Sequence, residues 1–163
     1  MEKIYQIKRI YTKKTSFYNA AEMPINRHKR WIFKELSEMI KVLFICHGNI
    51  CRSTMSEYVM KYLTDQAGVA SEFYIDSAAT SREEIGNGVH HGTRQKLKEV
   101  GIPCGNHRAR QMMRRDYEEF DYIIGMDAWN IRNIMRIIGS DPEKKVSMLL
   151  DFSDRPGTEI ADP

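Results

Sequence analysis

The segment formed by residues 41–53, KVLFICHGNICRS, constrains the fold more than any other part of the chain. Its first residues, 42–45, are continuously apolar, which is typical of a strand buried on both faces of a parallel sheet. Five residues separate Cys46 from Arg52, and Ser53 opens a pattern typical of a helix. The segment therefore predicts a strand, a short loop and a helix, with a thiol at the start of the loop and a guanidinium at its end.

The predicted helix follows the loop directly. Its apolar residues lie three or four positions apart and Gly68 ends the pattern; these residues are Met55, Tyr58, Val59, Tyr62 and Leu63. A helix N-terminus offers unpaired N–H groups and a partial positive charge, so it binds phosphate readily. Gly48 lets the backbone approach a ligand closely, and Arg52 can bind two phosphate oxygens at once. We therefore expect the loop to bind a phosphate group.

Cys46 gives this predicted phosphate site a nucleophile. A positive local field favours the thiolate form of a cysteine, and a thiolate beside a phosphoryl group can act in covalent catalysis. The loop lacks the Gly-Lys-Ser/Thr ending of a nucleotide-binding P-loop, so we do not expect it to bind a nucleotide in that way.

Charge is distributed unevenly along the 163 residues, a length that suits one domain. Residues 1–40 contain nine Lys or Arg and four Asp or Glu, whereas residues 41–163 contain sixteen and eighteen. We interpret 1–40 as a basic N-terminal extension of unknown role and 41–163 as the domain. A charge run is usually solvated, and no apolar run could span a membrane, so we expect neither a nucleic-acid nor a membrane partner.

The three cysteines do not form an even disulfide framework, and a thiolate nucleophile needs a reducing compartment. The sequence therefore favours a cytoplasmic protein. It gives no prediction of the oligomeric state.

The rest of the chain alternates between short β-rich runs and helical patterns. The predicted strands after the first are 73–78, 122–126 and 146–150. The predicted helices are 93–100 with Thr93 as N-cap, 113–120, and a helix capped by Asp127 and ended by Gly139. This alternation predicts an α/β fold, a doubly wound four-stranded parallel sheet with helices on both faces and the ligand at the carboxyl ends of the strands.

The Cys-x5-Arg-Ser pattern at the end of the first strand resembles that of the low-molecular-weight protein tyrosine phosphatases, and the resemblance covers residues 41–163. It implies hydrolysis of a phosphotyrosine protein or a small aryl phosphate through a cysteinyl-phosphate intermediate, without a cofactor or metal. Cys46 would be the nucleophile, Arg52 the phosphate clamp, and Asp162 of Asp162-Pro163 the general acid and base. From the residues alone, any of several acidic residues in 151–162 could supply the proton.

The resemblance also implies roles for further residues. The phosphate-binding loop would comprise His47, Gly48, Asn49, Ile50, Cys51 and Ser53. A hydrogen-bond network under the loop would join Asn49, Ser53, Ser77 and His107. Ser77 could instead only bond the backbone at the end of its strand, His107 could be an ordinary buried histidine, and Asp127 could serve only as a helix cap.

Cys51 lies five residues after Cys46, but a lone pair at this spacing is weak evidence for zinc. The resemblance implies instead that Cys51 traps oxidised Cys46 as a disulfide. Cys104 is most simply a half-buried free thiol. Ile50 would form an apolar wall suited to a phenyl ring, whereas related arginine phosphatases have threonine there. Arg82, Glu83 and Glu84 stand where many members have an aromatic residue, so we expect one polar wall.

Three alternatives remain open at this point. They are an inactive phosphate-binding domain, an arsenate reductase, which would need resolving cysteines, and a protein arginine phosphatase. The family continues past Asp-Pro with an aromatic pair, a loop and a final helix, whereas this chain reaches Pro163. We therefore expect a domain that is incomplete at its C-terminus and lacks the family's final helix.

Overall fold

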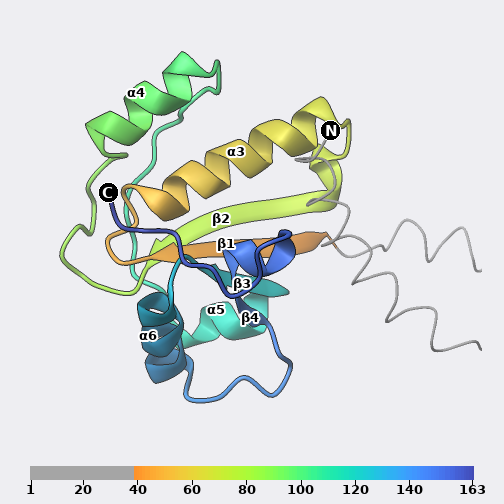
Figure 1. Cartoon of the computed structure of the whole chain (residues 1–163), viewed down its shortest axis with the longest axis vertical. Coiled ribbons are helices and arrows are strands. Elements are labelled where there is room, and N and C mark those ends of the chain that lie inside the picture. Colours follow the sequence, from red (N-terminus) through yellow and green to blue (C-terminus); the bar gives the residue numbers. More distant parts are fainter. Residues whose placement is uncertain (1–38) are drawn as a thin grey trace, which may run out of the picture.

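The computed structural model describes residues 39–163, so the prediction for the basic extension lies outside the described residues except for its last two. Four parallel strands form one sheet in the order β2-β1-β3-β4 (Figure 1). The strands are β1 (Ile40–Cys46), β2 (Phe73–Ala79), β3 (Tyr122–Gly125) and β4 (Val146–Met148). The helices are α3 (Arg52–Gln66), α4 (His91–Glu99), α5 (Arg114–Glu119) and α6 (Ala128–Ile138). The predicted four-stranded parallel α/β fold is confirmed.

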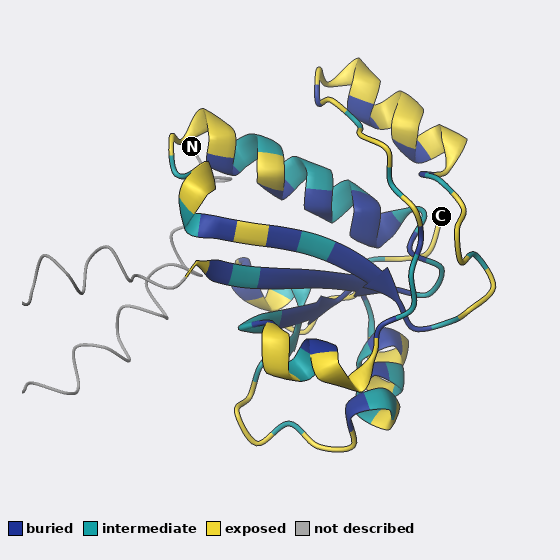
Figure 2. Cartoon of the chain, turned by 180° about the vertical axis from the view of Figure 1, so that it is seen from behind, coloured by how far each residue is buried: buried dark blue, intermediate teal, exposed yellow. Residues whose placement is uncertain are grey.

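The central position of β1 explains its apolar sequence. It pairs with β2 on one side and β3 on the other, and it is the most completely buried strand in Figure 2. The register places Cys46 opposite Ala79 of β2 and Ile45 opposite Gly125 of β3. The carboxyl ends of three strands therefore meet at one edge of the sheet, beside the thiol.

Each face of the sheet has its own core. Val42 packs in the same cluster as Met60 of α3, whereas the next residue, Leu43, packs with Ile134 of α6 on the opposite face. Successive side chains of a strand point to opposite faces, so an apolar run such as 42–45 supplies both cores. The prediction that helices cover both faces is confirmed: α3 lies on one, and α5 and α6 lie on the other (Figure 1).

The buried side of α3 is more polar than the apolar pattern indicates. The five apolar residues that predict the helix are all only half-buried. Its buried side chains are instead Arg52, Ser53, Thr54, Glu57, Met60 and Thr64. Because the first turns of α3 lie beside the loop after β1, part of this polar side meets hydrogen-bonding groups of the loop and of β2.

The end signals of α6 are confirmed. The backbone N–H of Asn130 donates to Asp127 Oδ1 at 2.6 Å, and the positive φ of 86° at Gly139 ends the helix. For α4, the predicted N-cap is wrong. The helix begins at His91, because His90 Nδ1 accepts the N–H of Gly92 at 3.3 Å and so caps it three residues earlier than Thr93 would.

The fourth strand is shorter than predicted. It ends at Met148, and a 3-10 helix, Leu149–Phe152, follows directly. Residues 153–163 contain no helix and return to the carboxyl edge of the sheet, where the N–H of Ile160 donates to the carbonyl of Met126 at 2.8 Å. Among residues 39–163, no helix is both long enough and apolar enough to cross a membrane.

Candidate active site

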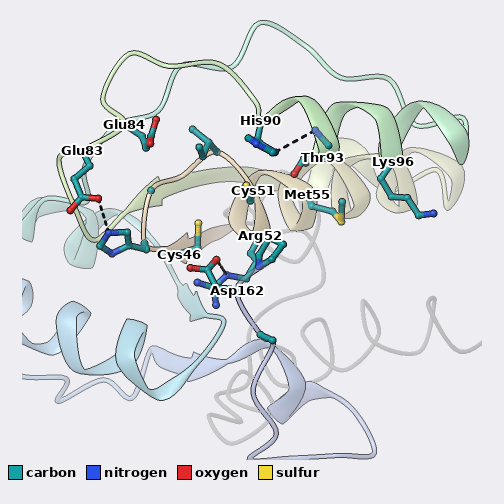
Figure 3. Close-up of a pocket in the computed structure, with 16 residues that line it drawn as sticks. Cys46, Cys51, Arg52, Met55, Glu83, Glu84, His90, Thr93, Lys96 and Asp162 are labelled. Carbon is teal, nitrogen blue, oxygen red and sulfur yellow. Dashed lines mark hydrogen bonds and ion pairs between the residues drawn. The ribbon is translucent and has the colours of Figure 1, made fainter.

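A cavity of about 800 Å³ opens at the carboxyl end of β1 (Figure 3). The loop after β1, the loop after β2, α4 and the last residues of the chain all contribute to its lining. The residues that line it include Cys46, His47, Gly48, Ile50, Cys51, Arg52, Met55, Glu83, Glu84, His90, Thr93, Lys96 and Asp162. The structure therefore brings the predicted nucleophile, phosphate clamp and acid to one cavity.

Cys46 ends β1 and is 3% exposed. Its Sγ lies 3.1 Å from Ser53 Oγ, and the backbone N–H of Asn49 donates to it at 3.3 Å. Donors directed at a sulfur stabilise negative charge on it, since a hydrogen bond to an ionised acceptor is stronger than one to a neutral acceptor. The thiol is therefore placed where the chain can stabilise it as a thiolate.

Asn49 holds the loop in its conformation. It is fully buried and has a positive φ of 59°, a left-handed conformation that asparagine tolerates better than most residues. Its Nδ2 donates to Ser53 Oγ at 3.0 Å and to Ser77 Oγ at 2.8 Å. Its carbonyl accepts from His107 Nε2 at 2.7 Å. The four residues expected under the loop therefore do lie together, and the Ser77 hydroxyl bonds the loop through Asn49.

Two further residues, Glu57 and Arg110, belong to this network and are not predicted from the sequence. Ser77 Oγ donates to Glu57 Oε2 at 2.5 Å, and the other oxygen of this buried carboxylate accepts from Lys61 at 2.5 Å. The backbone N–H of Arg110 donates to Asn49 Oδ1 at 3.1 Å. Glu57 could have been found, because it lies four positions after Ser53, which places both on one helix face. Arg110 carries no comparable signal, since its contribution comes from the backbone.

Arg52 begins α3 and connects three segments of the chain. Its Nη1 donates to Asp127 Oδ2 at 2.5 Å and to the carbonyl of Ile160 at 2.9 Å. Its Nε lies 2.9 Å from Asp162 Oδ1, but this N–H has no hydrogen-bond partner among residues 39–163, so the contact is an ion pair with poor hydrogen-bond alignment. Asp127 thus both caps α6 and binds the guanidinium.

Backbone donors of the loop add to this unpaired N–H. Among residues 39–163, the N–H groups of Gly48, Ile50 and Cys51 have no hydrogen-bond partner, and the first N–H groups of α3 follow them. Unpaired N–H groups that precede a helix N-terminus, together with a buried arginine, can bind an anion. The loop therefore has the donors that the predicted phosphate site requires.

Asp162 reaches the cavity from the segment 153–163, and its side chain is 64% exposed. Two contacts hold this segment next to it: the Ile160–Met126 backbone bond and the bond from Arg52 to the Ile160 carbonyl. In Figure 3, Asp162 lies beside Arg52 and near Cys46. A carboxyl group there can exchange protons with a group bound above the thiol.

Cys51 lines the cavity as a free thiol. Burial raises its pKa, and the neighbouring negative charges of Cys46 and Asp162 raise it further, while a hydrogen bond with Thr93 opposes them. Cys104 is a half-buried free thiol, as predicted, and does not line the cavity. Within residues 39–163, no group of three or more His, Cys, Asp or Glu side chains could hold a metal ion.

The rim of the cavity has apolar and charged parts. Ile50 and Met55 are apolar lining residues, whereas Glu83 and Glu84 come from the loop after β2. The predicted polar wall is therefore present, but Arg82 does not line the cavity.

The chain matches one family model over most of its length. Residues 41–163 match the model described as low molecular weight phosphotyrosine protein phosphatase. The low molecular weight protein-tyrosine-phosphatase YfkJ of Bacillus subtilis is 39% identical over 126 residues, which cover 77% of this chain and 81% of that protein. The low molecular weight phosphotyrosine protein phosphatase of Saccharomyces cerevisiae is 38% identical over 120 residues, covering 73% and 74%.

Solved structures show the same likeness. The crystal structure of YfkJ from Bacillus subtilis superposes with a TM-score of 0.73 and covers 77% of this chain and 80% of that one. A protein tyrosine phosphatase from Entamoeba histolytica, solved with Hepes in the active site, gives a TM-score of 0.70 at 30% identity and covers 76% and 80%. Sequence and fold agree, and the chain belongs to the low-molecular-weight phosphotyrosine protein phosphatases, a family of hydrolases.

Proposed function

We propose that this chain hydrolyses phosphotyrosine in proteins through a phosphorylated Cys46. The observation that carries the proposal is the surrounding of the Cys46 sulfur: two hydrogen-bonding groups, Ser53 Oγ and the Asn49 N–H, lie within 3.3 Å of it. The unpaired loop N–H groups and Arg52 lie in the same loop and line the same cavity. A nucleophile beside donors for three phosphoryl oxygens is what phosphoryl transfer requires.

In the first step, the Cys46 thiolate attacks the phosphorus atom of the bound phosphate ester. The S–P bond forms while the P–O bond to the phenol breaks, and a protonated Asp162 gives its proton to the leaving oxygen. Arg52 and the loop N–H groups stabilise the charge on the phosphoryl oxygens during transfer. The products of this step are a free tyrosine and a cysteinyl phosphate.

In the second step, water replaces the sulfur. The Asp162 carboxylate takes a proton from the water as it attacks phosphorus, and the S–P bond breaks with its electron pair returning to sulfur. Ser53 Oγ, 3.1 Å from Sγ, stabilises the departing thiolate. Inorganic phosphate leaves, Asp162 is protonated again, and the sum of the two steps consumes one phosphate ester and one water.

The apolar lining favours an aryl phosphate over phosphoarginine. Ile50 and Met55 offer apolar surface beside the loop, which suits a phenyl ring better than a guanidinium. Arsenate reduction is disfavoured for a different reason. Among the described cysteines only Cys46 and Cys51 line the cavity, and Cys104 lies outside it, so no second resolving thiol is at hand.

Steady-state kinetics of the full chain with a phosphotyrosine peptide and with p-nitrophenyl phosphate tests the proposal. We expect release of inorganic phosphate from both substrates, and its loss in Cys46→Ser. Cys104→Ser is the matched control, because it removes a thiol outside the cavity and should retain the activity. Phosphate release by the Cys46→Ser variant at the rate of the unmodified chain would refute the proposed mechanism.

A further inference from the structure

The mouth of the cavity carries two carboxylates, although the proposed substrate is an anion. Glu83 and Glu84 line the same cavity as the phosphate-binding loop, and Figure 3 shows them on the side opposite Lys96. A carboxylate near a bound phosphate group repels it, so such a wall disfavours substrates that bring only negative charge. If the substrate also carries a positive charge on that side, the carboxylates attract this charge, and the attraction offsets their repulsion of the phosphate group.

Both carboxylates are held in place by neighbouring groups. The Glu83 carboxylate lies 3.1 Å from His47 Nε2, a side chain of the phosphate-binding loop itself. The stem of Glu84 lies over Gly48: a Cβ added to Gly48 would stand 3.0 Å from Glu84 Cγ, so the glycine makes room for it. Asn87 Nδ2 donates to the Glu84 carboxylate at 2.6 Å. The carboxylates are therefore positioned before any substrate arrives, which lowers the entropic cost of binding.

Basic side chains of the chain leave much of this charge uncompensated. Within residues 39–163, Glu84 forms no ion pair, and the only one of Glu83 is with His47, which is charged only when protonated. Lys96, on the far side of the cavity, pairs with Glu99 instead at 3.0 Å. A cation from the substrate would therefore find negative charge on the wall formed by the loop after β2.

We infer that the preferred substrate is a phosphotyrosine flanked by lysine or arginine, with the basic side chain bound by Glu83 and Glu84. This inference rests on the proposed function and adds the sequence context of the phosphotyrosine. Each exposed charge pair contributes modestly, so we expect the two together to favour a basic over a neutral peptide by about three- to tenfold. Glutamate beside the phosphotyrosine reverses the sign of the interaction, so the acidic peptide is the poorest substrate.

Three versions of one phosphotyrosine peptide test this. They differ only in the residues on either side of the phosphotyrosine, which are lysine, glutamine or glutamate. We expect kcat/KM, divided by the kcat/KM of the same protein for p-nitrophenyl phosphate, to fall in that order. In the double variant Glu83→Gln, Glu84→Gln, which keeps the size and one oxygen of each side chain but removes its charge, the three values should converge. Raising the salt concentration should weaken the preference of the unmodified chain.

Glu118→Gln is the matched control, because it removes an exposed carboxylate from α5, on the other side of the sheet, and should keep the preference. Equal values for the three peptides, or a preference that survives in the double variant, would overturn the inference. Affinities of the three peptides for Cys46→Ser provide a readout that does not need turnover. If phosphate release fails altogether, the proposed function fails, while the ratio of Kd values still decides between a basic preference and none.

Discussion

Residues 46–53 and residues 153–163 both contribute side chains to the cavity, but the chain holds the two segments differently. In the first segment, Cys46 and Asn49 are buried, and side-chain hydrogen bonds join the loop to α3 and to β2. In the second, Asp162 is mostly exposed, and its nearest anchors are the backbone bond of Ile160 and the contacts with Arg52. The proposed nucleophile is thus fixed by the core, whereas the proposed acid depends on a few contacts at the surface.

Arg52 connects these two segments. It lies in the loop–helix junction, yet its guanidinium contacts Asp127, the Ile160 carbonyl and Asp162. The Arg52 Nε–H has no hydrogen-bond partner among residues 39–163, although it forms an ion pair with Asp162. A bound phosphate group could accept this hydrogen bond and would then compete with Asp162 for the guanidinium. Changes in the loop should therefore affect phosphate binding and the chemical step together, whereas changes in 153–163 should affect mainly the proton transfer.

The largest expected effect on activity comes from a change in the buried segment, residues 46–53. Cys46→Ser should lower kcat for p-nitrophenyl phosphate by at least about 10⁴-fold, because the remaining hydroxyl is a far weaker nucleophile. Thermal unfolding should change little, since serine keeps the size of the side chain. A residual activity within tenfold of the unmodified chain would mean that this sulfur is not the nucleophile.

The role of the exposed segment, residues 153–163, is tested by Asp162→Asn. Loss of the proton donor should lower kcat by about 10²–10⁴-fold for phosphotyrosine, where the leaving phenolate is basic. The reduction in the first step should be smaller for an aryl phosphate with a more acidic phenol, because that leaving group needs less proton transfer. Single-turnover rates across a series of substituted phenyl phosphates measure this, and an equal reduction for all leaving groups would contradict the assignment of Asp162 as the acid.

The connection that Arg52 makes between the two segments is tested by Arg52→Lys. Lysine keeps the positive charge but cannot offer the planar set of donors that contacts Asp127 and Ile160 and reaches toward phosphate. We expect kcat/KM to fall by about 10²–10³-fold and the inhibition constant of inorganic phosphate to rise. Arg132→Lys, on the outer side of α6, is the control that should leave both values unchanged.

Asn49→Ala should reveal how much the network under the loop stabilises the fold. It removes hydrogen bonds to Ser53, Ser77 and the Arg110 backbone and places alanine at a positive φ. The free energy of unfolding in urea should fall by about 1–3 kcal/mol, because buried polar groups lose their partner. Asn106→Ala, at an exposed position, should change it by less than about 0.5 kcal/mol.

The smallest effect concerns the second thiol of the loop. Burial raises the pKa of Cys51, so at neutral pH a smaller fraction is thiolate in the folded chain than in the unfolded one. In a Cys46→Ser, Cys104→Ser chain, alkylation of Cys51 by iodoacetamide should therefore increase with pH only well into the alkaline range. The same chain unfolded in urea should show the increase at lower pH; identical midpoints would contradict the effect of burial.

The sequence predicts those features of the fold and the site that depend on neighbouring residues. The strand, loop and first helix follow from a local pattern, and so do the Asp127 cap and the Gly139 end of α6, because caps and apolar runs act over a few residues. The resemblance grouped Asn49, Ser53, Ser77 and His107, which the fold brings together.

The features that the sequence does not predict depend on contacts between distant segments or on residues in uncommon roles. The pairing of Arg52 with Asp127 joins residues 75 positions apart, and that of His47 with Glu83 joins residues 36 apart, so neither leaves a local pattern. The sequence predicts the wrong N-cap for α4 because histidine is an uncommon capping residue, whereas threonine is a favoured one. Glu57 was missed because a glutamate on a helix is normally solvated, and here it is buried by the network.

The most direct test of the proposed mechanism is to trap the phosphorylated thiol. The full chain, and the Asp162→Asn variant in which water attack is slowed, are mixed with p-nitrophenyl phosphate, quenched within milliseconds and digested for mass spectrometry. The phenol of this substrate is acidic and leaves with little help from Asp162, so the variant still forms the intermediate. We predict one phosphoryl group on Cys46, accumulating to a higher level in the variant. Phosphate release with no phosphorylated Cys46 in either protein, or with the group on another residue, would contradict the mechanism.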